Sequence, residues 1–301
     1  MDKKELAIVL PVSGNMTYAL ATTLMGIKDN LIHKDYDIFV YYQNVSDDEK
    51  KLLNSILPVN FIEFKMDAST LQSDAIKKYS QLTFARFECF EHLKHYKKAL
   101  WIDIDTLIQK NLNELVELEV DFAAWQTDVW TGFNFSKPIN GYDMSKKYYN
   151  VGIMMISDKL NNYSELKKWC YKKTIEFGPL LICSDQSILN LLFQQFNINV
   201  YNLDERYNCH PDKDFVKDAY IVHPYAQYKF WNYYYNFNKW NEYYKKWIKM
   251  GGTPYKGWKA NWFDKLKIEF KKKYLPEAPD PKRHLRKFLL YAYNYNFKKV
   301  R

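Results

Sequence analysis

Cysteine is scarce in this 301-residue chain, and long hydrophobic runs are missing. The four cysteines stand far apart and form no C-x-x-C pair, which argues against a zinc site and against a disulfide framework. Isolated thiols of this kind fit a reducing, cytosolic compartment. No stretch approaches the roughly eighteen uninterrupted apolar residues that a membrane-spanning helix needs.

A targeting signal is also missing from the first residues. Residues 1–5 are mostly charged, and the apolar run after them covers only residues 6–12. No cleavage site made of small residues follows this run. We therefore expect it to be the first strand of the fold and not a signal peptide.

Positive charge is present but confined to one end of the chain. The net charge is +9, and residues 256–301 alone carry a balance of +10, with 14 basic and 4 acidic residues. A nucleic-acid-binding domain usually carries basic residues throughout its folded part. We therefore expect no nucleic-acid partner. Aromatic residues make up 18% of the chain, which suits stacking on sugars or contact with lipid, although an AT-rich genome gives the same excess.

Strand-like and helix-like segments alternate through the first half. The expected strands are residues 6–12, 37–42, 60–64 and 99–102, and the expected helices are residues 17–27, 46–56 and 79–93. This order predicts an α/β fold with a mostly parallel central sheet and helices on both faces.

The second half continues less regularly. A polar, aromatic segment over residues 127–149 reads as a functional loop between two strands. The expected strands are residues 122–125, 151–156, 197–201 and 220–223, and the expected helices are residues 111–118, 165–177 and 184–193. After Gly251 and Gly252 the composition becomes basic and aromatic. We expect one domain over residues 1–250 and an extension over residues 251–301.

Two aspartates follow the apolar run of residues 99–102. Asp103 and Asp105 are one residue apart, so in an extended chain they point to the same side. They stand at the carboxyl end of a strand, where open α/β sheets bind ligands. Two such carboxylates repel unless a cation lies between them, and a divalent cation carrying a diphosphate fits. The alternative is that each aspartate only caps a turn.

Four further segments accompany this D-x-D pair. They are T-F-A-R-F at residues 83–87, Y-N-V-G-I-M-M at residues 149–155, S-D-Q-S-I-L-N at residues 184–190 and H-P-Y-A-Q-Y-K-F-W at residues 223–231. Together, over roughly residues 6–231, the chain resembles the family 8 retaining glycosyltransferases. These have the Rossmann-like GT-A fold and include bacterial lipooligosaccharide galactosyltransferases and glycogenin. The basic, aromatic tail also resembles that of bacterial members.

The resemblance implies a metal site and a diphosphate contact. Asp103, Asp105 and His223 would hold the metal, and Lys229 would contact the diphosphate of the donor. Two carboxylates and an imidazole favour Mn²⁺, with Mg²⁺ possible. Without the resemblance, His223 would read as a structural histidine and Lys229 as a surface lysine.

The resemblance also implies the donor-binding residues. Arg86 and Asp185 would hold sugar hydroxyls, and Gln186 would lie beneath the anomeric carbon, so Asp185 and Gln186 are the candidate catalytic residues. Further donor-binding positions would be Val12, Asn15, Ile104, Asn150 and Gly152, besides Asp103 and Lys229. Plainer explanations are a salt bridge for Arg86, a strand entry for Asn150 and a helix cap for Ser184 and Asp185.

The chain departs from the family pattern at three places. Just after Trp125 the family often has an aspartate, and here Asp128, three residues later, is one candidate for it. After the first strand the family has acidic residues against the nucleotide, and here only Asn15 matches. In the segment after His223, Ala226 and Phe230 replace the usual glycine and proline.

The expected function is transfer of glucose or galactose from a UDP-sugar to a hydroxyl of a growing surface glycan, glycolipid or glycoprotein. The anomeric configuration would be retained, by departure and attack on one face of the sugar and not through a covalent Gln186 adduct. The enzyme would be cytoplasmic and peripheral on the inner face of the cell membrane, with its tail on anionic lipid, unless the tail aromatics pack onto the domain. The alternatives are a degenerate transferase that binds carbohydrate as a scaffold, and a metal-dependent nucleotidyltransferase.

Overall fold

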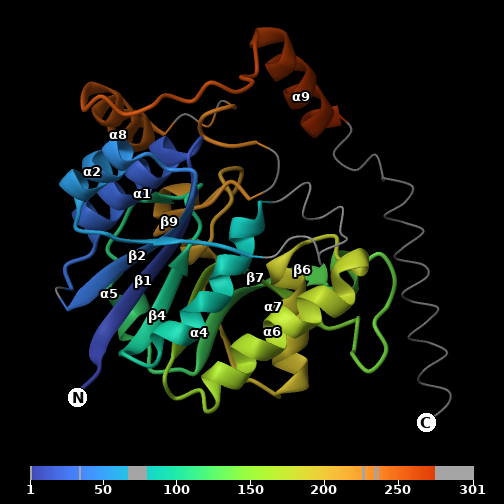
Figure 1. The fold of residues 1–301 in the computed structure, drawn as a ribbon. Coiled ribbons are helices and arrows are strands. Elements are labelled where there is room, and N and C mark those ends of the chain that lie inside the picture. The colour runs from blue at the N-terminus through green and yellow to red at the C-terminus, as the bar shows by residue number, and fades with distance from the viewer. Residues whose placement is uncertain are drawn as a thin grey trace.

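A central seven-stranded sheet organises the chain (Figure 1). The computed structural model describes residues 2–33, 35–66, 80–225, 228–233, 235 and 237–274. The strands are β1 (Lys4–Ser13), β2 (Tyr36–Gln43), β3 (Asn60–Glu63), β4 (Tyr96–Ile102), β6 (Phe122–Trp130), β7 (Lys147–Ser157) and β8 (Val200–Asn202). Their order in the sheet is β3-β2-β1-β4-β7-β6-β8.

The sheet is mostly parallel, as the alternation of elements predicted. Strands β3, β2, β1 and β4 pair in parallel, and so do β6 and β8. Strand β7 is antiparallel to both of its neighbours, β4 and β6. Because β1 lies between β2 and β4, the chain changes direction across the sheet at β1, and the carboxyl ends of β1 and β4 lie side by side. Such a switch point is where open α/β sheets bind ligands.

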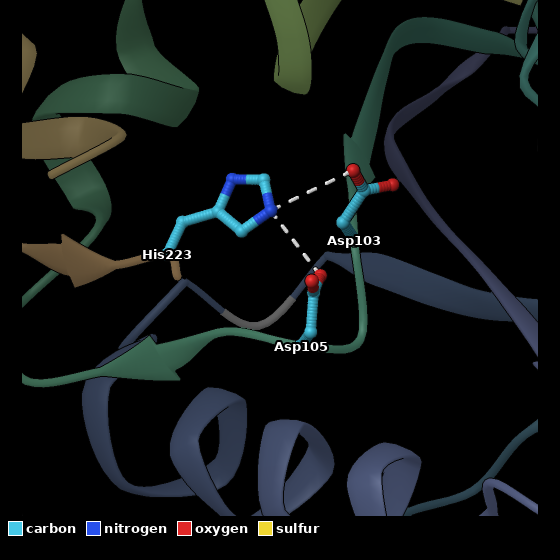
Figure 2. A group of neighbouring side chains, drawn as sticks. All are labelled: Asp103, Asp105 and His223. Atoms are coloured by element: carbon cyan, nitrogen blue, oxygen red, sulfur yellow. Dashed lines mark ion pairs between the residues drawn. The ribbon is translucent and has the colours of Figure 1, made fainter. Parts of the chain in front are cut away.

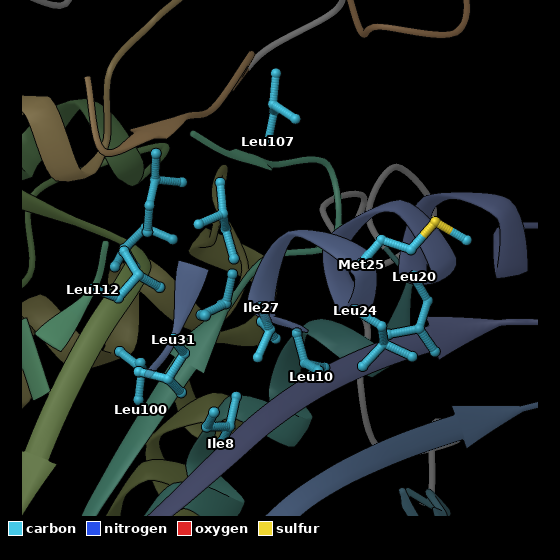
Figure 3. Packing of buried hydrophobic residues seen from close by; sticks show 14 of the residues in the cluster. Ile8, Leu10, Leu20, Leu24, Met25, Ile27, Leu31, Leu100, Leu107 and Leu112 are labelled. Atoms are coloured by element: carbon cyan, nitrogen blue, oxygen red, sulfur yellow. The ribbon is translucent and has the colours of Figure 1, made fainter. Parts of the chain in front are cut away.

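Helices cover both faces of the sheet (Figure 1). One face carries α1 (Thr17–Asn30), α2 (Asp47–Ile56), α5 (Asn113–Glu117) and α8 (Asn238–Lys249). The other carries the 3₁₀ helix η2 (Gln81–Glu88), α4 (Cys89–His92), α6 (Tyr163–Phe177) and α7 (Asp185–Gln195). Alternate residues of a strand point to opposite faces. Accordingly Ile8 and Leu10 of β1 pack under α1 (Figure 3), while Ala7 and Val9 belong to the core of the opposite face.

The helix predicted over residues 79–93 differs in type. Tyr79 lies outside the described residues, and the remainder begins as η2 and continues as the short helix α4. The spacing of the aromatic residues is compatible with this form, since Phe84 and Phe87 of η2 are three residues apart and both fully buried. A 3₁₀ helix has three residues per turn and aligns such side chains on one face.

The loop predicted over residues 127–149 is shorter than expected. Strand β6 continues through Trp130 with two register shifts, a 3₁₀ helix η3 (Thr131–Asn134) follows, and β7 begins at Lys147. The Thr127 hydroxyl donates to the Tyr148 carbonyl oxygen at 3.0 Å, within the irregular part of the ladder. A side chain thus supplies a contact between the strands where the regular register is lost.

A second sheet of two strands joins distant parts of the chain. Strand β5 (Leu107–Ile108) pairs antiparallel with β9 (Ile221–Val222). Both strands are buried in the core beneath α1. This pairing brings the segment after the D-x-D pair next to the segment that carries His223.

The first part of the expected extension contacts the domain. The Trp247 indole donates to the Thr253 carbonyl oxygen at 3.0 Å, and the ring centroids of Tyr18 and Tyr255 are 5.6 Å apart. Helix α9 (Trp262–Tyr274) then projects beyond the sheet and its covering helices (Figure 1). Residues 275–301 lie outside the described residues, and a separate unit beginning at residue 251 stays a prediction. Among the described residues, no helix combines the length and apolar character needed to cross a bilayer.

Candidate active site

Two antiparallel ladders bring the D-x-D pair and His223 together. The β4–β7 ladder pairs Ile102 with Ile153 and continues one step, because the Asp103 amide donates to the Gly152 carbonyl oxygen at 2.8 Å. The β5–β9 ladder pairs Leu107 with Val222, so that the residues just before Leu107 lie beside those just after Val222.

The three predicted metal ligands converge from these ladders (Figure 2). His223 Nε2 lies 3.2 Å from Asp105 Oδ1 and 3.9 Å from Asp103 Oδ2. One ligand atom from each residue falls within 4.8 Å of the others. Hard carboxylate oxygens together with one imidazole suit a small divalent cation.

Gly152 makes the close approach of these groups possible. A Cβ atom on this residue would lie 2.4 Å from His223 Cε1 and 2.9 Å from Asp103 Oδ2. Any side chain would therefore displace two of the three candidate ligands. A glycine is therefore required at this position by the packing of His223 and Asp103 against its backbone.

Lys229 reaches the same cluster. Its Nζ lies 2.5 Å from Asp105 Oδ2 and donates to the Pro224 carbonyl oxygen at 2.8 Å. Burial by itself would raise the pKa of Asp105, but Lys229 and His223 outweigh it and hold that pKa well below its usual range. Asp105 is therefore a carboxylate at neutral pH.

Arg86 is buried and bridges two carboxylates. Only 2% of the residue is exposed, and its guanidinium pairs with Asp103 Oδ1 at 2.6 Å and with Asp185. The Trp101 indole lies under the guanidinium, 4.9 Å from ring centroid to Cζ, and its Nε1 donates to Asp103 Oδ1 at 2.7 Å. Because these two donors engage Oδ1, the other oxygen of Asp103 faces His223.

The Gln186 side chain is held by its amide oxygen. Oε1 accepts hydrogen bonds from the Tyr148 hydroxyl at 2.6 Å and from the Val151 amide at 3.2 Å. Gln186 stands in the first turn of α7, directly after Asp185. The Ser184 side chain does not cap this helix; its hydroxyl instead donates to Asp185 Oδ1 at 2.7 Å.

Asn150 lies behind the cluster with a second asparagine. Its Oδ1 accepts from the Gly152 amide and from Asn208 Nδ2, both at 2.9 Å. Asn208 Oδ1 in turn lies 2.7 Å from Nδ1 of His223. All three side chains are buried.

Comparison with known proteins identifies the family of this chain. The model of Glycosyl transferase family 8 matches residues 7–234, which is most of the chain. The chain belongs to glycosyl transferase family 8. A putative glycosyltransferase of Haemophilus influenzae is 26% identical over 220 residues, covering 66% of this chain and 62% of the relative. Human glycogenin-2 is 25% identical over 198 residues, covering 62% of this chain and 34% of its own length. The matched part thus spans less than two thirds of these relatives.

Solved structures show the same fold. The galactosyltransferase LgtC, solved with donor and acceptor sugar analogues, superposes with a TM-score of 0.63 at 16% identity, over 81% of this chain and 99% of LgtC. The bifunctional glycosyltransferase WbbM gives a TM-score of 0.62 at 19% identity, over 83% of this chain and 52% of WbbM. These likenesses confirm the expected GT-A architecture.

The remaining predicted donor residues of this family 8 glycosyltransferase lie at the switch point of the sheet. Val12 is buried at the end of β1, and the exposed Asn15 follows it, accepting from the Ser13 hydroxyl at 2.7 Å. Ile104 stands between the two aspartates, and its carbonyl oxygen accepts from Thr23 Oγ1 at 3.1 Å. Contact of these residues with a nucleotide stays a prediction. Ala226 lies outside the described residues.

Sequence reasoning missed three side chains that contact the candidate site. Trp101 could have been found, since it stands two residues before Asp103 and shares its side of the strand. Tyr148 lay inside a segment predicted as a loop. Asn208 carries no motif and lies fifteen residues before His223, so only the fold brings the two together.

Proposed function

We propose that this family 8 glycosyltransferase is a metal-dependent, retaining hexosyltransferase. It would move glucose or galactose from a UDP-sugar to a hydroxyl of a growing surface glycan, glycolipid or glycoprotein. The observation that carries this proposal is the cluster of Asp103, Asp105 and His223. It lies beside the buried ion pair of Arg86 and Asp185. The cluster suits a metal-bound diphosphate, and the neighbouring pair suits a sugar.

The leaving group would be bound at the D-x-D pair. Asp103, Asp105 and His223 would hold Mn²⁺, or Mg²⁺ in its place, and the bound cation would neutralise the diphosphate as a Lewis acid. Lys229 supports this role because its ammonium already lies beside Asp105. Its charge would stabilise the negative charge that develops on the diphosphate as the glycosidic bond breaks.

The donor sugar would lie against Arg86, Asn150, Gly152, Asp185 and Gln186. Asp185 and Gln186 support this placement because both stand at the start of α7, next to the guanidinium that touches Asp103. The Gln186 amide oxygen is engaged by two donors and is in any case a weak nucleophile. We therefore favour departure and attack on one face of the sugar over a covalent adduct. Val12, Asn15 and Ile104 would contact the nucleotide.

A panel of UDP-sugars tests the proposal directly. We expect UDP release with UDP-glucose or UDP-galactose in the presence of Mn²⁺, and loss of release when EDTA removes the metal. Asp103→Asn and Asp105→Asn should each abolish turnover, because each keeps the shape of the side chain and removes its charge. Asp218→Asn is the matched control, since Asp218 is an exposed aspartate that pairs with Lys110.

The outcomes of this experiment separate the alternatives. Full activity in either D-x-D variant would exclude the metal assignment. Glycan binding without UDP release from any donor would favour a degenerate transferase. Release of sugar 1-phosphate in place of UDP would favour a nucleotidyltransferase.

The extension is proposed to hold the enzyme at the inner face of the cell membrane. Helix α9 exposes Trp262, Phe263, Leu266 and Phe270, with 51–74% of each residue accessible. Three of these are spaced by four residues and share one face of the helix. This exposure favours contact with lipid over the alternative, in which the tail aromatics pack onto the domain. Aromatic side chains favour the headgroup zone, and nearby lysines attract anionic lipid. The aromatic residues predicted for the same role at positions 288–293 lie outside the described residues.

A further inference from the structure

A chain of three hydrogen bonds leads from the backbone of β7 to the imidazole of His223. The Gly152 amide donates to Asn150 Oδ1 at 2.9 Å, and Asn208 Nδ2 donates to the same oxygen at 2.9 Å. Asn208 Oδ1 then lies 2.7 Å from His223 Nδ1. Asn208 is fully buried, so water does not compete for these groups.

The direction of every bond in this chain follows from its first member. A backbone amide can only donate, so the Asn150 atom that faces Gly152 must be the carbonyl oxygen. The Asn208 atom that faces this oxygen must therefore be its NH₂ group. Asn208 consequently presents its own oxygen to the imidazole, and an oxygen without a hydrogen can only accept. The bond requires a proton on His223 Nδ1.

We infer that Asn208 is a positioning residue that fixes the tautomer of His223. With the single proton of the neutral imidazole on Nδ1, Nε2 carries a free lone pair and faces Asp103 and Asp105. A metal can be bound only through such a bare nitrogen, and a partner on the other ring nitrogen orients the ligand.

The alternative to this arrangement is the other neutral tautomer of His223. His223 could carry its proton on Nε2 and donate it to Asp105 Oδ1, 3.2 Å away. Nδ1 would then need a donor, so Asn208 would have to turn its amide over and point its oxygen at the Asn150 oxygen. Two acceptors would face each other in a buried position, which is unfavourable. The chain of bonds from Gly152 thus disfavours the neutral tautomer that would donate its Nε2 proton to Asp105.

Nitrogen NMR of the metal-free protein tests the tautomer itself. Protonated and bare imidazole nitrogens differ clearly in ¹⁵N shift. The His223 signals are those that disappear in His223→Gln. With the imidazole neutral, we expect the proton on Nδ1 in the full chain. A proton on Nε2 would overturn the inference, and this result depends on neither metal binding nor activity.

Two substitutions of Asn208 test its role. Asn208→Leu removes the acceptor, and it should move the proton partly to Nε2 and weaken Mn²⁺ binding about 10- to 100-fold. Asn208→Asp keeps an acceptor facing Nδ1 but loses the donor to Asn150 Oδ1, so it should keep the Nδ1 proton while the Mn²⁺ affinity recovers only in part. Titration with Mn²⁺ alone, followed by electron paramagnetic resonance, measures the affinity.

A control and a contrary result complete the test. Thr174→Val removes a buried hydrogen bond within α6, to the Cys170 carbonyl oxygen, and should leave Mn²⁺ binding unchanged at comparable loss of stability. Loss of the Nδ1 proton in Asn208→Asp would overturn the positioning role, as would unchanged Mn²⁺ affinity in Asn208→Leu. The Mn²⁺ titration rests on the proposed metal site, whereas the NMR measurement of the tautomer does not. If the unaltered chain binds no Mn²⁺, the proposed metal site fails while the NMR result still decides the tautomer.

Discussion

Gly152 shows how much of the site depends on a single missing side chain. It supplies the carbonyl oxygen that receives the Asp103 amide, and its own amide begins the hydrogen bonds that lead to Asn208. Its missing Cβ leaves the space into which His223 and Asp103 close. The residue thus contributes to the cluster through backbone groups and through empty space.

Replacing Gly152 by alanine should therefore disrupt the cluster. The new methyl group would overlap His223 and Asp103, so we expect Mn²⁺ affinity to fall at least about tenfold. The free energy of unfolding should fall by about 1–3 kcal/mol, the usual cost of overpacking. Isothermal calorimetry and urea unfolding measure the two effects.

Gly178→Ala is the matched control for this substitution. A Cβ atom at Gly178 meets nothing within 4 Å, and the backbone there is right-handed helical. Stability and Mn²⁺ affinity should both stay unchanged in this variant. Normal Mn²⁺ affinity in Gly152→Ala would show that the cation binds away from His223.

At the scale of single residues, the sequence predicted those site residues that lie close together along the chain and have the chemistry of a site. The D-x-D pair is visible because its two carboxylates share a side of one strand. The bridge from Arg86 to Asp185 is not visible, because it joins η2 to α7 across the core. Asn208 is likewise brought to His223 by strand pairing between distant segments.

At the scale of elements, periodicity predicted where helices lie more reliably than which kind they are. The phenylalanines of residues 84–90 repeat every third residue, a spacing that a helix of either kind shows over a few turns. Only packing against β1 and β2 decides for the tighter 3₁₀ form. The lengthening of β6 had no clear signal, because its register shifts break the alternation that marks a strand.

The packing of α4 on β2 should make stability depend on pH. His92 of α4 stacks on Phe39, with ring centroids 4.2 Å apart, and contacts the Tyr41 hydroxyl at 3.2 Å. Burial lowers the pKa of His92 from 6.5 to about 4. Between these values the unfolded chain binds a proton that the folded chain does not. Stability must therefore fall as the pH is lowered from 6.5 towards 4.

His92→Gln should remove this part of the pH dependence. The histidine contributes a loss of at most about 3 kcal/mol over that range, from the linkage of pKa to stability. Urea unfolding at pH 7 and pH 5 would show a smaller difference in the variant than in the unaltered chain. His95→Gln replaces an exposed histidine nearby and should keep the full difference. An equal pH dependence in His92→Gln would contradict the assignment.

At the scale of the whole molecule, alternation of strands and helices was enough to predict the layered α/β fold. The reversal of β7 was not predicted, because nothing in a short apolar run records its direction. This reversal matters, since it sets Gly152 opposite Asp103. The same limit applies to α9, whose sequence showed basic and aromatic character but not its projection from the body.

The projection of α9 leads to a prediction about the membrane. The triple substitution Trp262→Ser, Phe263→Ser and Leu266→Ser should release the protein from anionic phospholipid vesicles. Sedimentation at low salt, where charges are least screened, measures this. Transfer to a small soluble acceptor should be unchanged, because these side chains lie outside the site.

A control separates this effect from a general loss of apolar surface. Ile32→Ser together with Ile175→Ser removes exposed apolar side chains from other parts of the domain and should leave vesicle binding intact. If the unaltered chain ignores anionic vesicles at low salt, the membrane proposal is wrong.

The pairing of β5 with β9 also sets when the enzyme can first work during its own synthesis. Asp103 and Asp105 leave the ribosome well before His223, by on the order of ten seconds at ordinary rates of translation. Until β9 emerges, β5 has no partner strand and the two aspartates have no imidazole beside them. A nascent chain can therefore assemble the proposed cation site only after β9 has emerged, when the strands of the central sheet have already been made.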